Sequence, residues 1–208
     1  MILAKRELLL KSKMMELSQN KMLVVDEQTH LCFPTIDYTS ELFELIQTNR
    51  AYLARYLPWI PNIQKEWHAQ RFLKEARMMN KGKQRLTTLI IHQTKLAGAV
   101  SLVHMDTLNK RAEMGYWLKE DLQGQGIMTR SCSRLIRYAF MGLHLNRVEM
   151  RMVTGNTISK KIPLRLGFEL EGILKEYQMK EEGRFENVEV YALLKKDWKN
   201  RMDKNGTK

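Results

Sequence analysis

Two closely spaced glycines precede a helical pattern and could help to bind an anion. Gly124 and Gly126 follow an apolar segment, and apolar residues at helical spacing begin directly after them. Glycine allows backbone N–H groups to turn inward, and the first turn of a helix offers unpaired N–H donors at a positive dipole end. The segment from Gln123 to Thr129 is therefore a candidate anion cradle.

Three interpretations of this turn compete. A Rossmann dinucleotide site needs a third glycine and an acidic residue about twenty positions further on, but Met128 and Thr129 follow Gly126 here. An ATPase phosphate loop needs a Gly-Lys-Ser/Thr ending, which this turn lacks. The third interpretation, a tight turn that binds no ligand, is still possible when the turn is considered alone.

Carboxylate and hydroxyl side chains near this turn could move protons. Glu113 begins the strand pattern before the turn, and Glu120 lies just past that strand. Either carboxylate could accept a proton from an amine, or could simply pair with a lysine on the surface. Ser159 follows Asn156 by three residues, so both fall in the first turn of a predicted helix, where each could cap the helix or face a ligand.

The composition argues against several other kinds of site. Cys32 and Cys132 lie far apart, with no second Cys or His at ligand spacing, so we expect neither a metal site nor a disulfide framework. The apolar residues, 44% of the chain, are too dispersed for a membrane span, and Lys5 and Arg6 interrupt the apolar start. We therefore predict a cytoplasmic protein without a transmembrane or secretory segment.

The positive charge is concentrated at the two ends of the chain. Of the formal net charge of +12, residues 1–21 carry +3 and residues 195–208 carry +4, which leaves +5 between them. Such ends are mostly solvated, although they could also attract ribosomal RNA, an acidic protein or an anionic cofactor. No RNA-reading signature accompanies them.

Periodicity predicts a mixed α/β domain, with no repeat and no long linker, in a chain long enough to bury a sizeable core. We expect helices over residues 41–46, 49–56, 63–80, 128–140 and 157–166. We expect a strand or hairpin over 22–34, strands over 86–91, 96–103, 112–118 and 148–153, and a long hairpin of 168–179 and 185–194.

We place the domain at residues 22–196. Residues 1–21 are an N-terminal extension, which is either a short helix or a segment upstream of a natural start at Met14, Met15 or Met22. Residues 197–208 form a basic C-terminal tail.

Four motifs follow one another along the chain: Ala112–Leu118 (AEMGYWL), Gln123–Ile127 (QGQGI), Asn156 with Ser159, and Pro163–Phe168 (PLRLGF). In this order and spacing they resemble the GNAT superfamily of acetyl-CoA-dependent N-acetyltransferases, and within it the RimJ/RimL branch of ribosomal-protein N-terminal acetyltransferases. The resemblance covers about residues 22–196. Met128 departs from the superfamily pattern, which has a small residue there.

The resemblance implies an α/β GNAT fold, with a mixed, mostly antiparallel central sheet that is flanked by helices and splayed at the cofactor site. The splay would lie between 112–118 and 148–153, with acetyl-CoA as the co-substrate in the gap. The implied cofactor-binding residues are Trp117 and Leu118 for the pantetheine arm, Gln123, Gly124, Gln125, Gly126, Ile127, Met128 and Thr129 for the diphosphate, and Asn156.

The implied catalytic residues are Glu113 as the base and Ser159 as the proton donor to the thiolate, with Glu120 as an alternative base. The implied reaction transfers acetyl to an α-amino group of a protein or peptide, with ribosomal proteins among the candidates. Residues 49–61 and the hairpin of 168–194 should wall the acceptor side. Association with the ribosome and a homodimer are both compatible with this branch.

Two other functions stay open. The same fold could acetylate a small amine, such as an antibiotic, an amino acid or a polyamine, because a cofactor site does not define the acceptor. A non-catalytic protein that binds acetyl-CoA or RNA and acts as a regulator is the third candidate. The presence of Glu113, Asn156 and Ser159 favours an enzyme.

Overall fold

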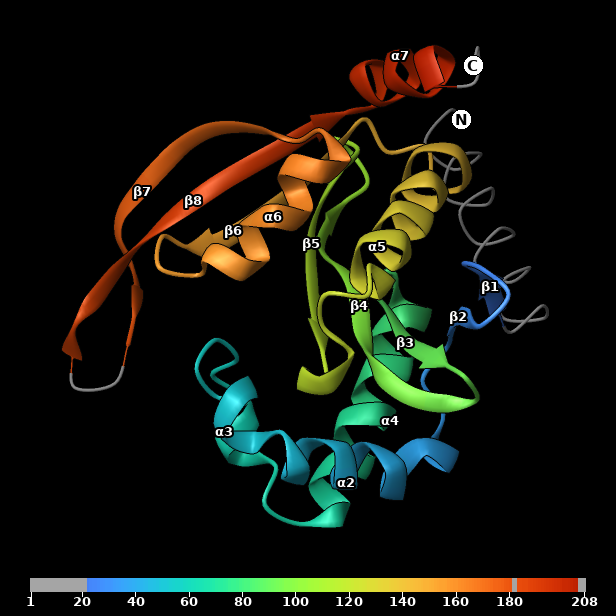
Figure 1. The fold of residues 1–208 in the computed structure, drawn as a ribbon, viewed down its shortest axis with the longest axis vertical. Coiled ribbons are helices and arrows are strands. Elements are labelled where there is room, and N and C mark those ends of the chain that lie inside the picture. Colours follow the sequence, from blue (N-terminus) through green and yellow to red (C-terminus); the bar gives the residue numbers. More distant parts are fainter. Residues whose placement is uncertain (1–21, 181–182, 206–208) are drawn as a thin grey trace.

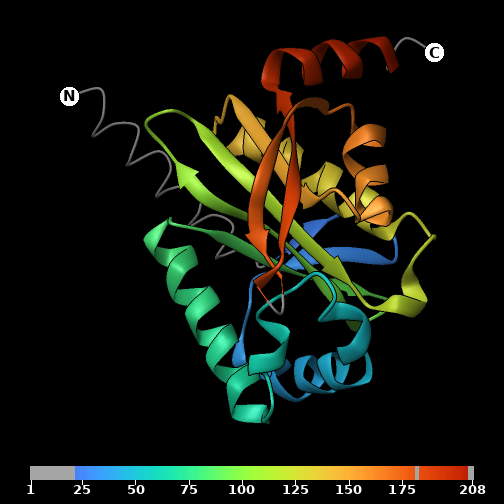
Figure 2. The ribbon, with the colours of Figure 1, turned by 90° about the vertical axis from the view of Figure 1, so that its left-hand side faces the viewer.

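An eight-stranded sheet organises residues 22–180 and 183–205, the part of the chain that the computed structural model describes (Figure 1). Its strand order is β1-β2-β3-β4-β5-β6-β8-β7, and every neighbouring pair is antiparallel except β5 and β6. Helices cover both faces of the sheet, with α4 on one side and α5 and α6 on the other (Figure 2). The predicted mixed, mostly antiparallel α/β sheet is confirmed.

The strands are β1 (Met22–Val24), β2 (Thr29–Cys32), β3 (Leu86–His92), β4 (Lys95–Asp106), β5 (Arg111–Leu118), β6 (Arg147–Val153), β7 (Glu169–Met179) and β8 (Phe185–Leu194). The α-helices are α2 (Thr39–Thr48), α3 (Arg50–Leu53), α4 (Glu66–Gly82), α5 (Ile127–Arg137), α6 (Thr157–Leu166) and α7 (Lys195–Asn205). Short 3-10 turns lie at Ile36–Tyr38, Ile60–Asn62 and Glu120–Leu122, and a π-helical turn, Tyr138–Gly142, continues α5.

Each face of the sheet buries its own apolar cluster. On one face, Leu135 and Ile136 of α5 pack against the strands, while Leu42 of α2 and Leu73 of α4 pack on the other. Because helices cover both faces, every residue of β3 is buried. Side chains therefore alternate along β5 between the α5 face and the α2–α4 face.

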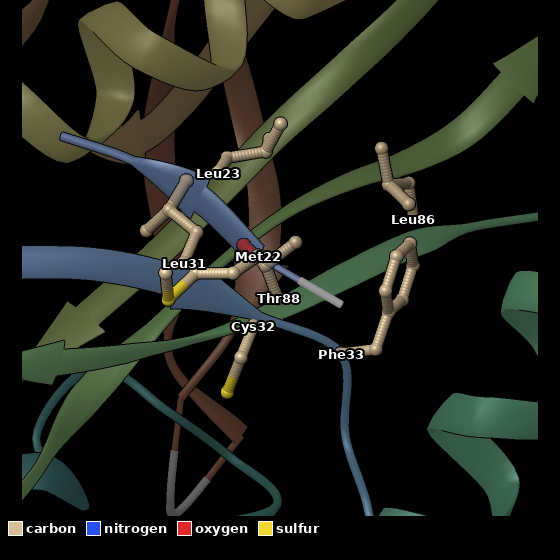
Figure 3. Close-up of a pocket in the computed structure, with 7 residues that line it drawn as sticks. All are labelled: Met22, Leu23, Leu31, Cys32, Phe33, Leu86 and Thr88. Carbon is tan, nitrogen blue, oxygen red and sulfur yellow. The ribbon is translucent and has the colours of Figure 1, made fainter. Parts of the chain in front are cut away.

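β1 and β2 close the far edge of the sheet. Leu23 and Leu31 from this hairpin are buried in the same cluster as Leu86 of β3. Figure 3 shows the narrow recess that these side chains line together with Cys32 and other neighbours. It encloses no volume that a water molecule could occupy, so the recess is part of the packing and not a binding site.

β5 and β6 pair over only a short stretch and then separate. Their parallel ladder joins Arg111 to Arg147, Ala112 to Val148, and Glu113 to Glu149, yet β5 continues to Leu118 and β6 to Val153. This is the predicted splay between the two strands, and it is confirmed.

Two differences from the predicted elements have clear physical causes. The helix expected from Ile63 begins at Glu66, because Lys65 is extended and its N–H donates to Nδ1 of His68, 3.0 Å away. Residues 197–205 of the basic C-terminal segment belong to α7, for which no helix was expected, and Trp198 of this helix packs on Phe140 with ring centroids 5.5 Å apart. The predicted N-terminal extension, 1–21, lies outside the described residues.

Candidate functional site

A cleft of about 890 Å³ opens where β5 and β6 separate. Its floor is the open half of β5, and its walls come from the turn before α5, the end of β6 and one face of α6. On the far side it reaches α3 with the loop that follows, and the β7–β8 hairpin. Figure 1 shows α3 facing this hairpin across the opening.

The open half of β5 presents backbone groups to the cleft. β4 pairs with β5 on one edge as far as Leu118, whereas β6 leaves the other edge after Glu113. The N–H and C=O groups that point toward β6 from Met114 onward therefore lack a strand partner. An extended ligand with amide groups can pair with this edge as a strand would.

The turn before α5 presents hydrogen-bond donors. Gly124 and Gly126 both have a φ of +75°, which is favourable for glycine alone, and Gly126 is the N-cap of α5. Gln123 also lines the site, and its buried side chain interacts with the side chain of Tyr52, another residue of the cleft. The free N–H groups at the start of α5 suit an anionic or strongly accepting ligand.

Arg130 fixes the position of this turn. Its Nη1 donates to the carbonyl oxygen of Gln125 at 3.0 Å, and its Nε donates to Oδ2 of Asp26 at 2.7 Å. The guanidinium thus ties the turn to the β1–β2 hairpin. A Cβ added at Gly126 would lie 2.8 Å from Nη1 of Arg130, so the turn is closely packed on that side.

The start of α6 brings Asn156 and Ser159 to the opposite wall. Oδ1 of Asn156 accepts a hydrogen bond from the backbone N–H of Ser159 at 3.1 Å, so Asn156 caps the helix. The hydroxyl of Tyr116, on β5, donates to the carbonyl oxygen of Ser159 at 3.1 Å. Both backbone groups of Ser159 are therefore engaged, while the residue lines the cleft.

A charged network holds the vertex where the strands diverge. Glu113 and Glu149 lie side by side on the last paired rung, and Arg151 reaches both, at 3.6 Å and 2.9 Å respectively. Arg147 also donates to Glu149, at 2.8 Å. Although burial alone raises the pKa of Glu149, the hydrogen bonds from Arg147 and Arg151 outweigh it and hold that pKa below its ordinary value.

The structure brings most of the predicted site residues to the cleft. Those that line it are Trp117, Leu118, Gln123, Gly124, Gly126, Ile127, Met128, Thr129, Asn156 and Ser159. Met128, the departure from the superfamily pattern, is buried in the core cluster behind the turn, which explains how a large residue fits there.

Three predicted residues lie beside the cleft and do not line it. Gln125 contributes its carbonyl oxygen to Arg130, and its side chain donates to the carbonyl of Asp121. Glu113 does not line the cleft itself, and its Oε2 lies 3.6 Å from Nε of Arg151, which does, and 3.3 Å from Nδ1 of His104. Glu120 is exposed, and its backbone N–H donates to Oδ1 of Asn49. The roles of these residues stay predictions.

The two segments that were expected to wall the acceptor side do line the cleft, whereas their role toward an acceptor stays a prediction. Residues 51–58 and Pro61 contribute on one side, and Gln178, Met179, Lys180 and Glu186 of the hairpin on the other. Trp59 stacks on Phe72, 5.0 Å between ring centroids, and Trp67 is exposed, so neither tryptophan lines this wall.

Sequence reasoning missed Tyr116 and Arg151 as parts of the site. Tyr116 belongs to a quoted motif, but nothing in its spacing shows that it reaches α6. Arg151 lies on a strand whose alternation with Arg147 and Glu149 indicates one charged face, which was a usable signal.

Two negative findings apply to residues 22–180 and 183–205. No group of three or more His, Cys, Asp and Glu side chains is placed to hold a metal ion there. Within the same residues, no helix has the length and apolarity that crossing a membrane would require.

Residues 31–169 match the acetyltransferase (GNAT) domain family. The ribosomal-protein-serine acetyltransferase of Escherichia coli (strain K12) is 30% identical over 170 residues, which cover 82% of this chain and 94% of that protein.

Two solved structures share the fold. The RimL ribosomal L7/L12 α-N-protein acetyltransferase in complex with coenzyme A has a TM-score of 0.79 and 27% identity, with 83% of this chain and 97% of that chain covered. The microcin C7 self-immunity acetyltransferase MccE, in complex with acetyl-CoA and AMP, has a TM-score of 0.78 and 29% identity, with 82% and 94% covered.

Coenzyme A binding at the turn before α5 can be tested by thermal unfolding. Saturating acetyl-CoA should raise the melting temperature of the wild-type chain by roughly 5–10 °C, because only the folded chain binds it. Gly126→Glu should remove this shift, since it puts a side chain and a negative charge into the cradle at a φ of +75°. Gly82→Glu, at a position with no atom within 4 Å of an added Cβ and outside the cleft, is the control and should keep the shift. A wild-type curve unmoved by acetyl-CoA would refute the assignment.

Proposed function

Because the chain belongs to the GNAT acetyltransferase family and is an acetyl-CoA-dependent N-acetyltransferase, we propose that its acceptor is the α-amino group of a protein, and of a ribosomal protein in particular. The observation that carries this proposal is the likeness, over 94% of that relative's length, to a ribosomal-protein-serine acetyltransferase. The α-N-protein acetyltransferase RimL, which has the same fold, supports it. We assign the acetyltransferase domain to residues 22–196, which contain the whole cleft.

The cleft residues fit acetyl-CoA. The open edge of β5 near Trp117 and Leu118 offers backbone groups that an amide-containing pantetheine arm can pair with. The turn from Gln123 to Thr129, which leads into the first turn of α5, offers backbone N–H donors for the diphosphate. Lys161 and Arg165, one turn apart on the cleft face of α6, add positive charge toward the same phosphates. Acetyl-CoA supplies the thioester from which the acetyl group is transferred.

Ser159 is placed to protonate the leaving thiolate. In the reaction, the amine nitrogen forms a bond to the acetyl carbon, the carbon–sulfur bond breaks, and the amine proton leaves to a base or to water. The Ser159 hydroxyl gives its proton to the sulfur and is reprotonated from solvent. The wall of α6 that carries Ser159 faces the open half of β5, which supports this role.

Glu113 is our preferred base, acting through a water molecule. It lies on the rung directly before the strands open, and Arg151 connects it to the cleft. Glu120, outside the cleft near α3, stays the alternative. A weak base suffices for an α-amine, because its pKa of about 7.7–8.0 leaves it neutral several hundred times more often than a lysine with a pKa near 10.4.

The setting of the reaction follows from this acceptor. We place the enzyme in the cytoplasm, where ribosomal proteins are made, and the basic residues of α7 suit association with the ribosome. Strand β7 is a sheet edge with exposed Leu170 and Ile173, which suits a homodimer.

A small-molecule amine is the second candidate acceptor. The likeness to MccE favours it, since that enzyme provides self-immunity to microcin C7 and its structure holds AMP beside acetyl-CoA. The two candidates differ in whether a peptide chain must extend between α3 and the β7–β8 hairpin.

The role of Ser159 predicts a selective loss of turnover. Ser159→Ala should lower kcat by roughly 10- to 1000-fold, because the thiolate loses its proton donor, and should leave the affinity for acetyl-CoA nearly unchanged. Thr157→Ala removes a hydroxyl from the same helical turn, at an exposed position outside the cleft, and should have wild-type kinetics. If Ser159→Ala loses affinity while its kcat survives, Ser159 serves in binding or in the structure of α6.

The acceptor proposal predicts selectivity between two amines of one peptide. Given a peptide with a free N-terminus and one internal lysine, the enzyme should label the α-amine almost exclusively, because only that amine is substantially neutral at pH 7. Fragmentation mass spectrometry locates the acetyl group, and the same peptide with a blocked N-terminus is the control. Ribosomal proteins with free N-termini should react in the same way. Acetyl on the lysine, or rapid acetylation of a polyamine or aminoglycoside while the peptide stays unlabelled, contradicts the proposal.

A further inference from the structure

α6 contains a proline at a position where the helix needs a donor. Pro163 lies inside the helix, which runs from Thr157 to Leu166. In an α-helix the N–H of residue 163 bonds to the carbonyl of residue 159, but proline has no N–H, and its ring pushes that carbonyl outward. The carbonyl of Ser159 therefore lacks the partner that its own helix would normally provide.

Two arms form the cleft, one built on β5 and the other on β6 with the helix α6 that follows it. Tyr116, on the β5 arm, supplies the donor that the carbonyl of Ser159 lacks within α6. Its hydroxyl lies 3.1 Å from the carbonyl oxygen of Ser159. Tyr116 stands on β5, three positions past the last rung that β5 shares with β6. Burial raises the pKa of Tyr116 above its ordinary value near 10, so the hydroxyl stays protonated and can donate at any physiological pH.

Ser159 is thereby held from two directions. Its backbone N–H is fixed by the cap residue Asn156, which belongs to the same arm, and its carbonyl is fixed by Tyr116 from the opposite arm. The β5–β6 ladder no longer sets the distance between the arms at this level. Proton transfer requires the donor and the acceptor to lie about 2.6–3.2 Å apart, so this distance matters for the reaction.

We propose that Tyr116 is a positioning residue, and that its hydrogen bond across the cleft, which Pro163 makes available, sets the separation between Ser159 and the open edge of β5. The thioester sulfur is located by β5, whereas the proton donor is located by α6. The Tyr116 hydroxyl, which connects the two arms, keeps the distance between the Ser159 hydroxyl and the sulfur constant. The catalytic part of this inference rests on the role proposed above for Ser159.

A double-mutant cycle distinguishes two possible roles of the Tyr116 hydroxyl. It either connects β5 to α6 across the cleft, or it only gives the carbonyl of Ser159 a hydrogen-bond partner. Tyr116→Phe removes one oxygen atom and keeps the ring that packs on the core. We expect it to lower kcat about tenfold with less than about a threefold change in the KM for acetyl-CoA, and to raise the unfolding equilibrium constant about tenfold. Urea unfolding and steady-state kinetics provide the two readouts.

Pro163→Ala restores an N–H that can reach the carbonyl of Ser159. In that background, Tyr116→Phe should raise the unfolding equilibrium constant by no more than about threefold, because the carbonyl keeps a partner. The kcat of Tyr116→Phe/Pro163→Ala should stay about tenfold below that of Pro163→Ala, because the link between the arms is still missing. If Pro163→Ala restores kcat along with stability, Tyr116 only satisfies a carbonyl and the proposal is wrong.

Thr88→Val is the matched control. Thr88 is also buried, and its hydroxyl donates to a backbone carbonyl, that of Val100 at 2.8 Å, but the residue does not line the cleft. The loss of this hydroxyl should lower stability and leave kcat unchanged. A kcat of Tyr116→Phe within twofold of wild type, or an equal loss of kcat in Thr88→Val, also overturns the proposal.

Failure of the proposed function has a different signature. Ser159→Ala could keep full turnover while the stability cycle shows the expected coupling. The hydrogen bond from Tyr116 to α6 would then be supported, and the proton-donor role of Ser159 would be refuted. If the stability cycle shows no coupling while Ser159→Ala is inactive, the connecting role of Tyr116 is refuted and the role of Ser159 is supported.

Discussion

The parallel ladder between β5 and β6 ends after Glu113 and Glu149, and the cleft exists because it ends there. Beyond this rung the facing edges of the two strands cannot complete their hydrogen bonds with each other, so they remain open to a ligand. Carboxylates directly opposite one another on neighbouring strands repel. Arg151 contacts both of them, so the same ion pairs stabilise the last rung and mark the point of divergence.

The two helices beside the cleft take their positions from these strands. α5 follows β5 after the turn that ends at Gly126, and α6 follows β6 after Asn156. The first turn of each helix therefore lies near the carboxyl end of its strand, next to the opening, where unpaired N–H groups and capping side chains face the ligand. The turn before α5 and the wall that carries Ser159 are thus both consequences of where the ladder ends. Beyond the end of the ladder, the hydroxyl of Tyr116 on β5 connects that strand to α6.

The parts of the fold and site that are contiguous in the chain could be predicted from the sequence, and the contacts between distant segments could not. The turn from Gln123 to Thr129 has a local signature, because glycine spacing and helical periodicity are local properties. The bond from Tyr116 to Ser159 spans 43 positions and depends on the arrangement of strand and helix in space. The helical state of α7 was missed for a similar reason, since Trp198 is apolar in a basic segment and finds its partner, Phe140, only in the folded chain. Which side chains of β5 reach the cleft follows from strand register, and sequence alone did not separate Glu113 from the residues that line it.

The two halves of the cleft differ in how they would respond to substitution. The half of the cleft proposed to bind the cofactor depends largely on backbone groups and helix ends, which tolerate side-chain changes that preserve the turn conformation. The half proposed to bind the acceptor is built from side chains of the loop after α3, such as Arg55 and Tyr56, and of the β7–β8 hairpin, such as Met179 and Lys180. These two segments are far apart in the sequence and meet across the opening (Figure 1). With the acceptor bound as we propose, a change of acceptor requires substitutions only in these two segments, and the β5–β6 ladder, the turn before α5 and the hydrogen bond from Tyr116 to Ser159 stay in place. This separation explains how one fold can serve a ribosomal-protein enzyme and a microcin-immunity enzyme with the same cofactor.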